Sequence, residues 1–154
     1  MKPDGHLRGV LIIIASLLGL LPGCGAQDPS RLAVCHARCA METRCAHRSE
    51  AQRATWADLA PGWDRWDAVI QRQLGPVGVV MVEALEVGDH DRHLDVASGT
   101  GEPGLTVARI APTARVVLTD ISAEMLEVAR RRAAAEGLGN VEAHVCSADD
   151  LPFD

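Results

Sequence analysis

A glycine-rich turn with an acidic residue just before it is the part of this sequence best suited to hold a ligand. Residues 94–105 read LDVASGTGEPGL, in which Asp95 lies inside an apolar run and three glycines follow it. Glycine allows backbone conformations and a close ligand approach that a Cβ atom would block. A second acid, Asp120, follows Gly101 by nineteen residues, at the end of the next apolar run. This pattern predicts a strand that turns sharply into a helix around a bound ligand.

The two acids distinguish between two classes of ligand. The letters GTGEPG satisfy the G-x-G-x-x-G pattern of dinucleotide-binding turns, and the spacing to Asp120 suits an acid that binds a ribose. Asp95, however, would bring a carboxylate close to a pyrophosphate, and like charges repel. A cationic cofactor suits Asp95 better, and S-adenosylmethionine carries a sulfonium and an α-ammonium group. We therefore expect Asp95 to bind the amino-acid end of that cofactor, directly or through water, and Asp120 to bind both ribose hydroxyls; an NAD(P)-dependent oxidoreductase is the alternative.

Strand and helix patterns alternate around this turn. Strands are expected at 93–97, 115–119 and 141–145, and helices at 104–110 and 125–136. Ser122 is expected to cap the start of the second helix, and Gly137 its end. Such alternation indicates an α/β fold with parallel strands joined by right-handed crossovers. In a sheet of this kind, ligands bind beyond the carboxyl ends of the strands.

Residues 41–90 are expected to form a helical cap ahead of the first strand. From Trp66 to Leu85 the apolar residues recur at helical spacing. The letters LGP at 74–76 are expected to divide this stretch into two amphipathic helices. Pro61 and Gly62 are expected to interrupt the chain before them and to leave the tryptophans of WADLAPGWDRW on a loop that closes over a ligand.

Residues 1–40 differ in character from the rest of the chain. Lys2 and Arg8 precede an apolar run at 10–21 and the letters PGCGA, which is the layout of a secretory signal, and LPGC resembles a bacterial lipoprotein cleavage box. Twelve apolar residues are too few to span a bilayer comfortably. Export would separate a cofactor-binding domain from its cofactor. The preferred interpretation is a cytoplasmic protein that starts at Met41; a genuine signal or membrane anchor, or an unrelated apolar helix, are the alternatives.

Composition excludes several partners and reactive groups. A net charge of −6 gives no basic surface for a nucleic-acid backbone, so nucleic acid is not an expected partner. The segment CHARCAMETRCAH contains cysteines and histidines, but its spacing matches no familiar zinc pattern, and no metal is expected. His90, His93 and His144 are not assigned as a base, because His93 and His144 lie in expected strands among apolar neighbours. Catalytic residues are left unassigned.

Three segments together resemble a known family. LDVASGTGEPGL, VVLTDISAEMLEVARRRA and CSADDLPFD are similar to the class I S-adenosylmethionine-dependent methyltransferases, particularly the branch of ubiquinone/menaquinone C-methyltransferases. The resemblance covers about residues 50–154. It implies a Rossmann-like α/β fold, S-adenosylmethionine as cofactor, and methyl transfer to a small-molecule acceptor, in which positioning of the reactants carries much of the rate.

The resemblance also implies a set of cofactor-binding residues. Ile121 would lie against the adenine, with Met125 nearby. Ala97 stands where many members have the first glycine, and Ser147 where many have an aspartate that binds the adenine amino group; Asp149 and Asp150 are close alternatives to Ser147. The full implied set is Asp95, Ala97, Ser98, Gly99, Thr100, Gly101, Asp120, Ile121, Met125, Ser147 and Ala148.

The chain stops at LPFD, just after the third expected strand, whereas the sheet of the family has seven strands. Residues 91–154 are therefore expected to be the N-terminal half of the fold, with a cofactor half and no complete catalytic site. The outer edge of the strand at 93–97 is expected to expose unpaired backbone groups. A partner chain that supplies the remainder, or a non-catalytic membrane-tethered remnant, are the alternatives.

Overall fold

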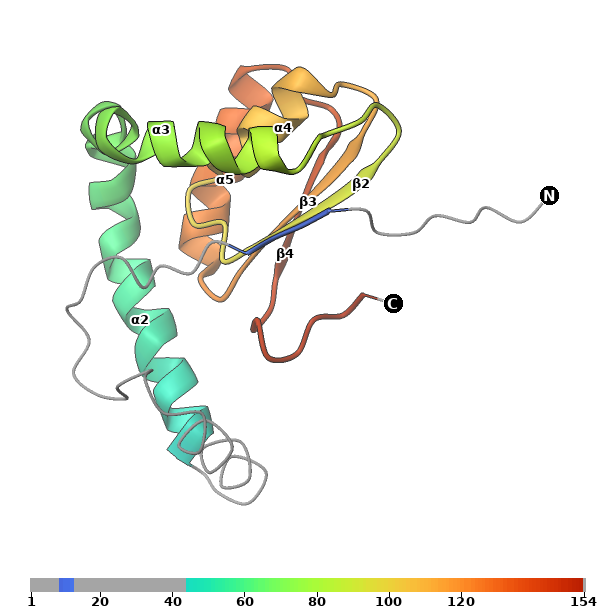
Figure 1. The fold of residues 1–154 in the computed structure, drawn as a ribbon. Helices are drawn as coiled ribbons and strands as arrows, with labels where there is room; N and C mark the ends of the chain where they lie inside the picture. Colours follow the sequence, from blue (N-terminus) through green and yellow to red (C-terminus); the bar gives the residue numbers. More distant parts are fainter. Residues whose placement is uncertain (1–8, 13–43, 154) are drawn as a thin grey trace.

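The computed structural model describes residues 9–12 and 44–153. Its elements alternate between helix and strand after an N-terminal strand and two consecutive helices (Figure 1). In chain order they are β1 (Gly9–Ile12), α2 (Arg44–Arg65), α3 (Asp67–Ala84), β2 (Arg92–Val96), α4 (Gly104–Ile110), β3 (Arg115–Asp120), α5 (Ala123–Ala135) and β4 (Val141–Val145).

The sheet is parallel throughout, in the order β1-β2-β3-β4. Leu94 of β2 pairs with Val117 of β3, which pairs in turn with Glu142 of β4. The predicted α/β class and parallel pairing are therefore confirmed. The bounds of α4 and β4 match the expected ranges, while β2, β3 and α5 differ from them by one or two residues at their ends.

The edge of β2 is paired, so the prediction of an exposed edge there is wrong. β1 lies along that edge, with Gly9 opposite His93 and Ile12 opposite Val96. The β-branched residues of this short apolar segment suit a strand, and pairing satisfies backbone groups of β2 that an open edge would leave free. The start of the predicted signal-like run is thus a strand; residues 13–21, its remainder, lie outside the described residues.

The cap helices are longer than predicted. α2 continues through Pro61 and Gly62, and α3 continues through Pro76, so the breaks expected at both places are wrong. The chain breaks instead at Trp66, which has φ −99° and ψ 14°. Trp56 and Trp63 lie seven residues apart on α2, and their rings meet edge to face at 6.3 Å between centroids. This packing favours a continuous helix and places both tryptophans away from any loop.

The main core lies between the sheet and helices α4 and α5. Its most buried side chains are Leu105, Leu118 and Leu126, each fully inaccessible to solvent. His93 is also buried, and neither of its ring nitrogens has a hydrogen-bond partner within the described part of the chain. Burial lowers the pKa of His93 below its ordinary value, although the Asp91 carboxylate opposes the shift. His93 therefore packs as part of the sheet and presents no surface to a ligand.

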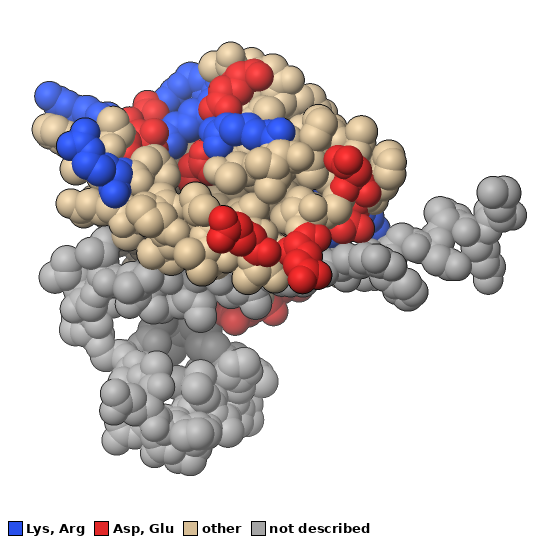
Figure 2. Space-filling model, turned by 45° about the horizontal axis from the view of Figure 1, so that its top comes forward, with Lys and Arg blue, Asp and Glu red and all other residues tan. Residues whose placement is uncertain are grey.

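Charges of both signs mix on the surface. On the face that Figure 2 shows, basic and acidic side chains lie next to one another. Arg109 pairs with both Glu102 and Glu136. Arg115 pairs with Glu142 in the same way. Among the described residues, no helix is long and apolar enough to cross a membrane.

Gly104 at the start of α4 tests the packing between loop and sheet. A Cβ atom there would lie 2.3 Å from Leu118 Cδ2 and 2.7 Å from Asp95 Oδ2. We expect Gly104→Ala to lower the free energy of unfolding by about 2 kcal/mol, because the buried neighbours must shift. Gly62→Ala is the control, since a Cβ there meets open space; inside a helix it should raise stability by up to about 1 kcal/mol. Urea unfolding measures both, and equal midpoints would contradict the packing.

Candidate functional site

The loop between β2 and α4 bends through left-handed backbone. The φ angles of Ala97, Gly99 and Gly101 are 59°, 54° and 111°. A Cβ on Gly101 would lie 2.7 Å from Leu105 Cδ1, whereas a Cβ on Gly99 would meet no described atom beyond its chain neighbours within 4 Å. Ala97 adopts a conformation that costs a residue with a side chain about 1 kcal/mol. The loop is therefore strained at its first position and open beside Gly99.

The carboxylate of Asp120 fixes this loop against the next one. Its Oδ2 accepts a hydrogen bond of 2.9 Å from the amide of Gly99, and its Oδ1 accepts one of 2.8 Å from the amide of Ser122. Burial raises the pKa of Asp120, although these backbone hydrogen bonds oppose the shift. Each carboxylate oxygen can accept more than one hydrogen bond, so Asp120 keeps acceptor capacity for ligand hydroxyls.

Asp95 is the most deeply buried acid of the site. Its side chain is only 1% exposed, and its Oδ2 accepts a hydrogen bond of 2.9 Å from the amide of Gly104, which begins α4. Among the described residues, none donates a hydrogen bond to its Oδ1. Burial raises the pKa of Asp95 well above its usual range, against the opposing effect of the Gly104 amide. An unpaired buried oxygen of this kind is costly, and a cationic group beside it would reduce the cost.

Further hydrogen bonds connect the carboxyl ends of β2, β3 and β4. The amide and hydroxyl of Ser98 both donate to the carbonyl of Thr119, at 2.8 and 3.2 Å. The amide of Cys146 donates to the carbonyl of Asp120 at 3.0 Å. The loop after β2, the end of β3 and the end of β4 therefore form one continuous region, as expected for ligand binding in a parallel sheet.

The remaining predicted residues lie around this region at different depths. Ile121 directly follows Asp120 and is partly exposed. Met125 is only 2% exposed, so its side chain lies on the buried face of α5 and has almost no surface open to a ligand. Ser147 and Ala148 follow β4, where the Ser147 hydroxyl accepts a hydrogen bond of 3.3 Å from the amide of Asp149 in a local turn. Hydrogen bonds thus join Gly99 directly to Asp120, while Ser147 is held only within its own turn.

Two arginines that the sequence did not indicate as part of the site contact this region. Arg53 of α2 donates to the carbonyl of Ile121 at 3.2 Å. Arg132 of α5 donates to both the hydroxyl and the carbonyl of Thr100. Both contacts join residues far apart in the chain, which spacing within one helix cannot reveal.

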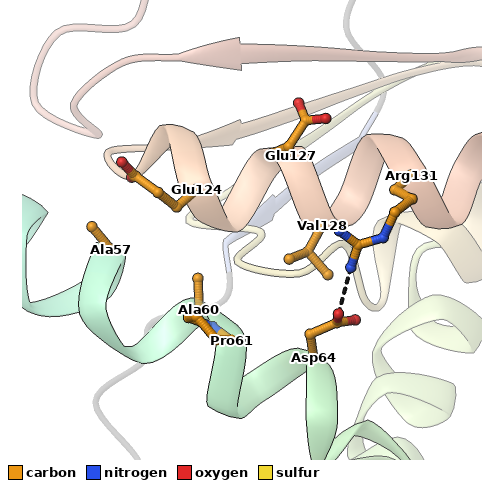
Figure 3. Close-up of a pocket in the computed structure, with 8 residues that line it drawn as sticks. All are labelled: Ala57, Ala60, Pro61, Asp64, Glu124, Glu127, Val128 and Arg131. Atoms are coloured by element: carbon orange, nitrogen blue, oxygen red, sulfur yellow. Dashed lines mark hydrogen bonds and ion pairs between the residues drawn. The ribbon is translucent and has the colours of Figure 1, made fainter.

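A shallow pocket of about 320 Å³ lies between α2 and α5 (Figure 3). Its lining combines small apolar side chains with charged ones and includes none of the predicted cofactor residues. The lining residues are Ala57, Ala60, Pro61, Asp64, Glu124, Glu127, Val128 and Arg131. This pocket is therefore distinct from the glycine loop.

The possible zinc ligands fall largely outside the structure. Cys35, His36 and Cys39 lie outside the described residues. Among the residues that are described, no cluster of histidine, cysteine and acidic side chains could hold a metal ion. Cys146 is a free thiol whose pKa is raised by burial.

Comparisons with known proteins relate part of this chain to methyltransferases. The family model for a methyltransferase domain matches residues 94–154. An uncharacterized protein of Mycobacterium tuberculosis is 34% identical over 66% of this chain and 34% of its own length. The ubiquinone/menaquinone biosynthesis C-methyltransferase UbiE of Pseudomonas entomophila is 40% identical over 47% of this chain and 29% of its own length. The crystal structure of the YcgJ protein from Bacillus subtilis matches 49% of this chain and 32% of its own at a TM-score of 0.46, with 30% identity.

The chain spans about a third of the length of the curated relatives that it matches. The family match begins at Leu94 and therefore covers the glycine loop and the acid at the end of β3.

The burial of Asp95 predicts a pH-dependent cost in stability. A carboxyl group whose pKa rises on folding contributes stability below its unfolded pKa and loses it as pH rises through the folded pKa. We expect Asp95→Asn to be more stable than the wild type at pH 7, by about 1–2 kcal/mol, because it removes a buried, partly unpaired charge. The difference should shrink from pH 8 to pH 5 in urea unfolding. Asp89→Asn, at an exposed site, is the control; equal stability of Asp95→Asn and wild type at every pH would contradict this account.

Proposed function

We propose that this chain binds S-adenosylmethionine at the glycine loop and serves methyl transfer to a small-molecule acceptor, because residues 94–154 match the family model for a methyltransferase domain. The observation that carries the proposal is the hydrogen bond from the Gly99 amide to Asp120. It would hold a ribose-binding acid beside Gly99, where a Cβ atom would meet no described atom beyond its chain neighbours within 4 Å. A cytoplasmic location, where the cofactor is available, accompanies this proposal.

The described residues fit a cationic nucleoside cofactor. Asp95 is only 1% exposed, and one of its carboxylate oxygens has no partner among the described residues, so its charge would favour the positively charged amino-acid end from inside the fold. Asp120 retains lone pairs for the ribose hydroxyls. Ile121 would lie against the adenine, and Ser147 would accept a hydrogen bond from its amino group. When bound, S-adenosylmethionine supplies an electrophilic methyl group on its sulfonium.

The residues of this chain would act by binding and orienting. Asp95 and Asp120 would hold the two ends of the cofactor and so fix the direction in which its methyl group points. Positioning of this kind can supply several kcal/mol of a reaction barrier. For the acceptor we propose a quinone precursor or another lipid-like small molecule, in line with the UbiE relatives.

The domain organisation follows from the same proposal. Residues 41–90 would form a helical cap, and 91–154 a partial S-adenosylmethionine-binding unit. The contacts between α2 and α5, including those of Asp64 with Arg131 and Arg132, support a cap that packs directly on the cofactor unit.

Substitution of Asp120 tests the proposal. Asp120→Asn replaces one of two acceptor oxygens with an NH2 group, which would face the backbone N–H of Gly99 or Ser122. The substitution should therefore disturb the loop and also weaken ribose binding. We expect at least a tenfold loss of affinity for S-adenosylmethionine in isothermal titration of the full chain, the size expected for lost hydrogen bonds to a charged group. Asp89→Asn, the same chemical change at an exposed site ahead of β2, should leave the affinity unchanged.

The same titration discriminates against the dinucleotide alternative. Wild-type protein should bind S-adenosylmethionine and its product S-adenosylhomocysteine, and should not bind NADH, because a pyrophosphate would meet the Asp95 carboxylate. Binding of NADH without binding of S-adenosylmethionine would overturn the proposed function.

A further inference from the structure

We propose that Arg132 is a positioning residue that couples the α2–α3 corner, residues 64–67, to the glycine loop. The loop is then held in its binding conformation only while Asp64 and Asp67 of this corner contact Arg132. For its effect on cofactor affinity, this inference rests on the proposed function. The coupling itself is a property of the ligand-free protein and can be measured without any cofactor.

The side chain of Arg132 touches three separate segments of the chain. Its Nη1 donates to Asp67 Oδ1 at 2.8 Å, and also to the hydroxyl and carbonyl of Thr100 at 3.2 and 3.4 Å. Its Nη2 donates to Asp64 Oδ1 at 3.3 Å. The planar guanidinium can address several acceptors at once in fixed directions. Arg132 therefore joins α2, α3 and the glycine loop through one group.

Thr100 is the loop residue that Arg132 contacts. It lies between the two left-handed glycines and is only 7% exposed. Other hydrogen bonds of the loop come from the sheet, from α4 or from the loop itself. Gly99 binds Asp120, Arg109 of α4 binds Glu102, and the amide of Gly101 donates to the carbonyl of Ser98. Within the described part of the chain, Arg132 is the one side chain whose hydrogen bonds join this loop to α2 or α3.

The two carboxylates come from opposite sides of the helix break. Asp64 belongs to the end of α2, Asp67 to the first turn of α3, and Trp66 lies between them. α3 also lies close over the end of the loop, because a Cβ on Gly78 would come within 3.3 Å of Pro103. If the corner moved away, Arg132 would lose both of its acidic partners while its side chain is 16% exposed.

Loss of those partners would change the loop. A largely buried guanidinium without its carboxylates is costly, so the side chain would turn toward solvent and leave Thr100. The position of the corner and the conformation of the loop therefore both depend on the side chain of Arg132. Because such coupling is reciprocal, a ligand that requires the ordered loop also favours the docked corner.

The neighbouring residue offers a matched control. Arg131 carries the same charge, lies on the same helix and pairs with the same Asp64, as Figure 3 shows. It is 57% exposed and makes no hydrogen bond with the loop. A comparison of Arg131 with Arg132 therefore separates the contact with Thr100 from a general loss of positive charge near Asp64.

Titration of the full chain with S-adenosylhomocysteine tests the effect on binding. We expect Arg132→Met to weaken binding about tenfold, and Arg131→Met to change it by less than about twofold. Arg132→Lys should give an intermediate loss, because an ammonium cannot address the same set of acceptors in fixed directions. Equal affinity of Arg132→Met and wild type, or an equal loss in Arg131→Met, would overturn the inference.

Amide hydrogen exchange without ligand tests the coupling independently. Arg132→Met should speed exchange at the amides of Thr100 and Gly101 about tenfold relative to Arg131→Met. If wild-type protein fails to bind S-adenosylhomocysteine, the proposed function fails, and this exchange result alone decides the inference. If Arg132→Met does not fold, Thr100→Val removes one acceptor from the loop side and should speed Gly101 exchange in the same direction; unchanged exchange would overturn the coupling.

Discussion

The carboxylate of Asp120 is the contact on which the rest of the candidate site depends. It ends β3, yet its two oxygens bind the amide of Gly99 in one loop and the amide of Ser122 in the next. The first hydrogen bond shapes the turn after β2, and the second orients the residue that caps α5. A single buried acid thereby aligns two loops and a helix start beside the same open space.

This arrangement is held at a cost in stability. Asp95 and Asp120 are both buried, and burial raises the pKa of each, so the folded protein resists their ionisation. Ala97 adds backbone strain directly before the loop. Strain and unpaired charge of this kind gather where a protein binds ligands, because a bound partner can relieve them. The core between the sheet and its helices supplies the stability that offsets these costs.

Features that depend on neighbouring residues could be predicted from the sequence in the second half of the fold. Features that depend on contacts between residues far apart in the chain could not. The Ser122 cap, the Gly137 helix end and the β4 range all follow from residues within a few positions of each other. The predicted break at Pro61 is wrong, because α2 continues through this residue despite its missing amide donor, next to the buried Ala60. The contact of Arg132 with Thr100 spans 32 positions, so no pattern within α5 could indicate it.

Backbone amide shifts would test the central claim most directly. In a two-dimensional NMR titration of the full chain with S-adenosylhomocysteine, the account predicts that the largest shifts fall on the amides of Gly99, Gly101 and Ile121, around the Asp120 carboxylate. Shifts confined to the pocket between α2 and α5, with these three amides unmoved, would contradict it.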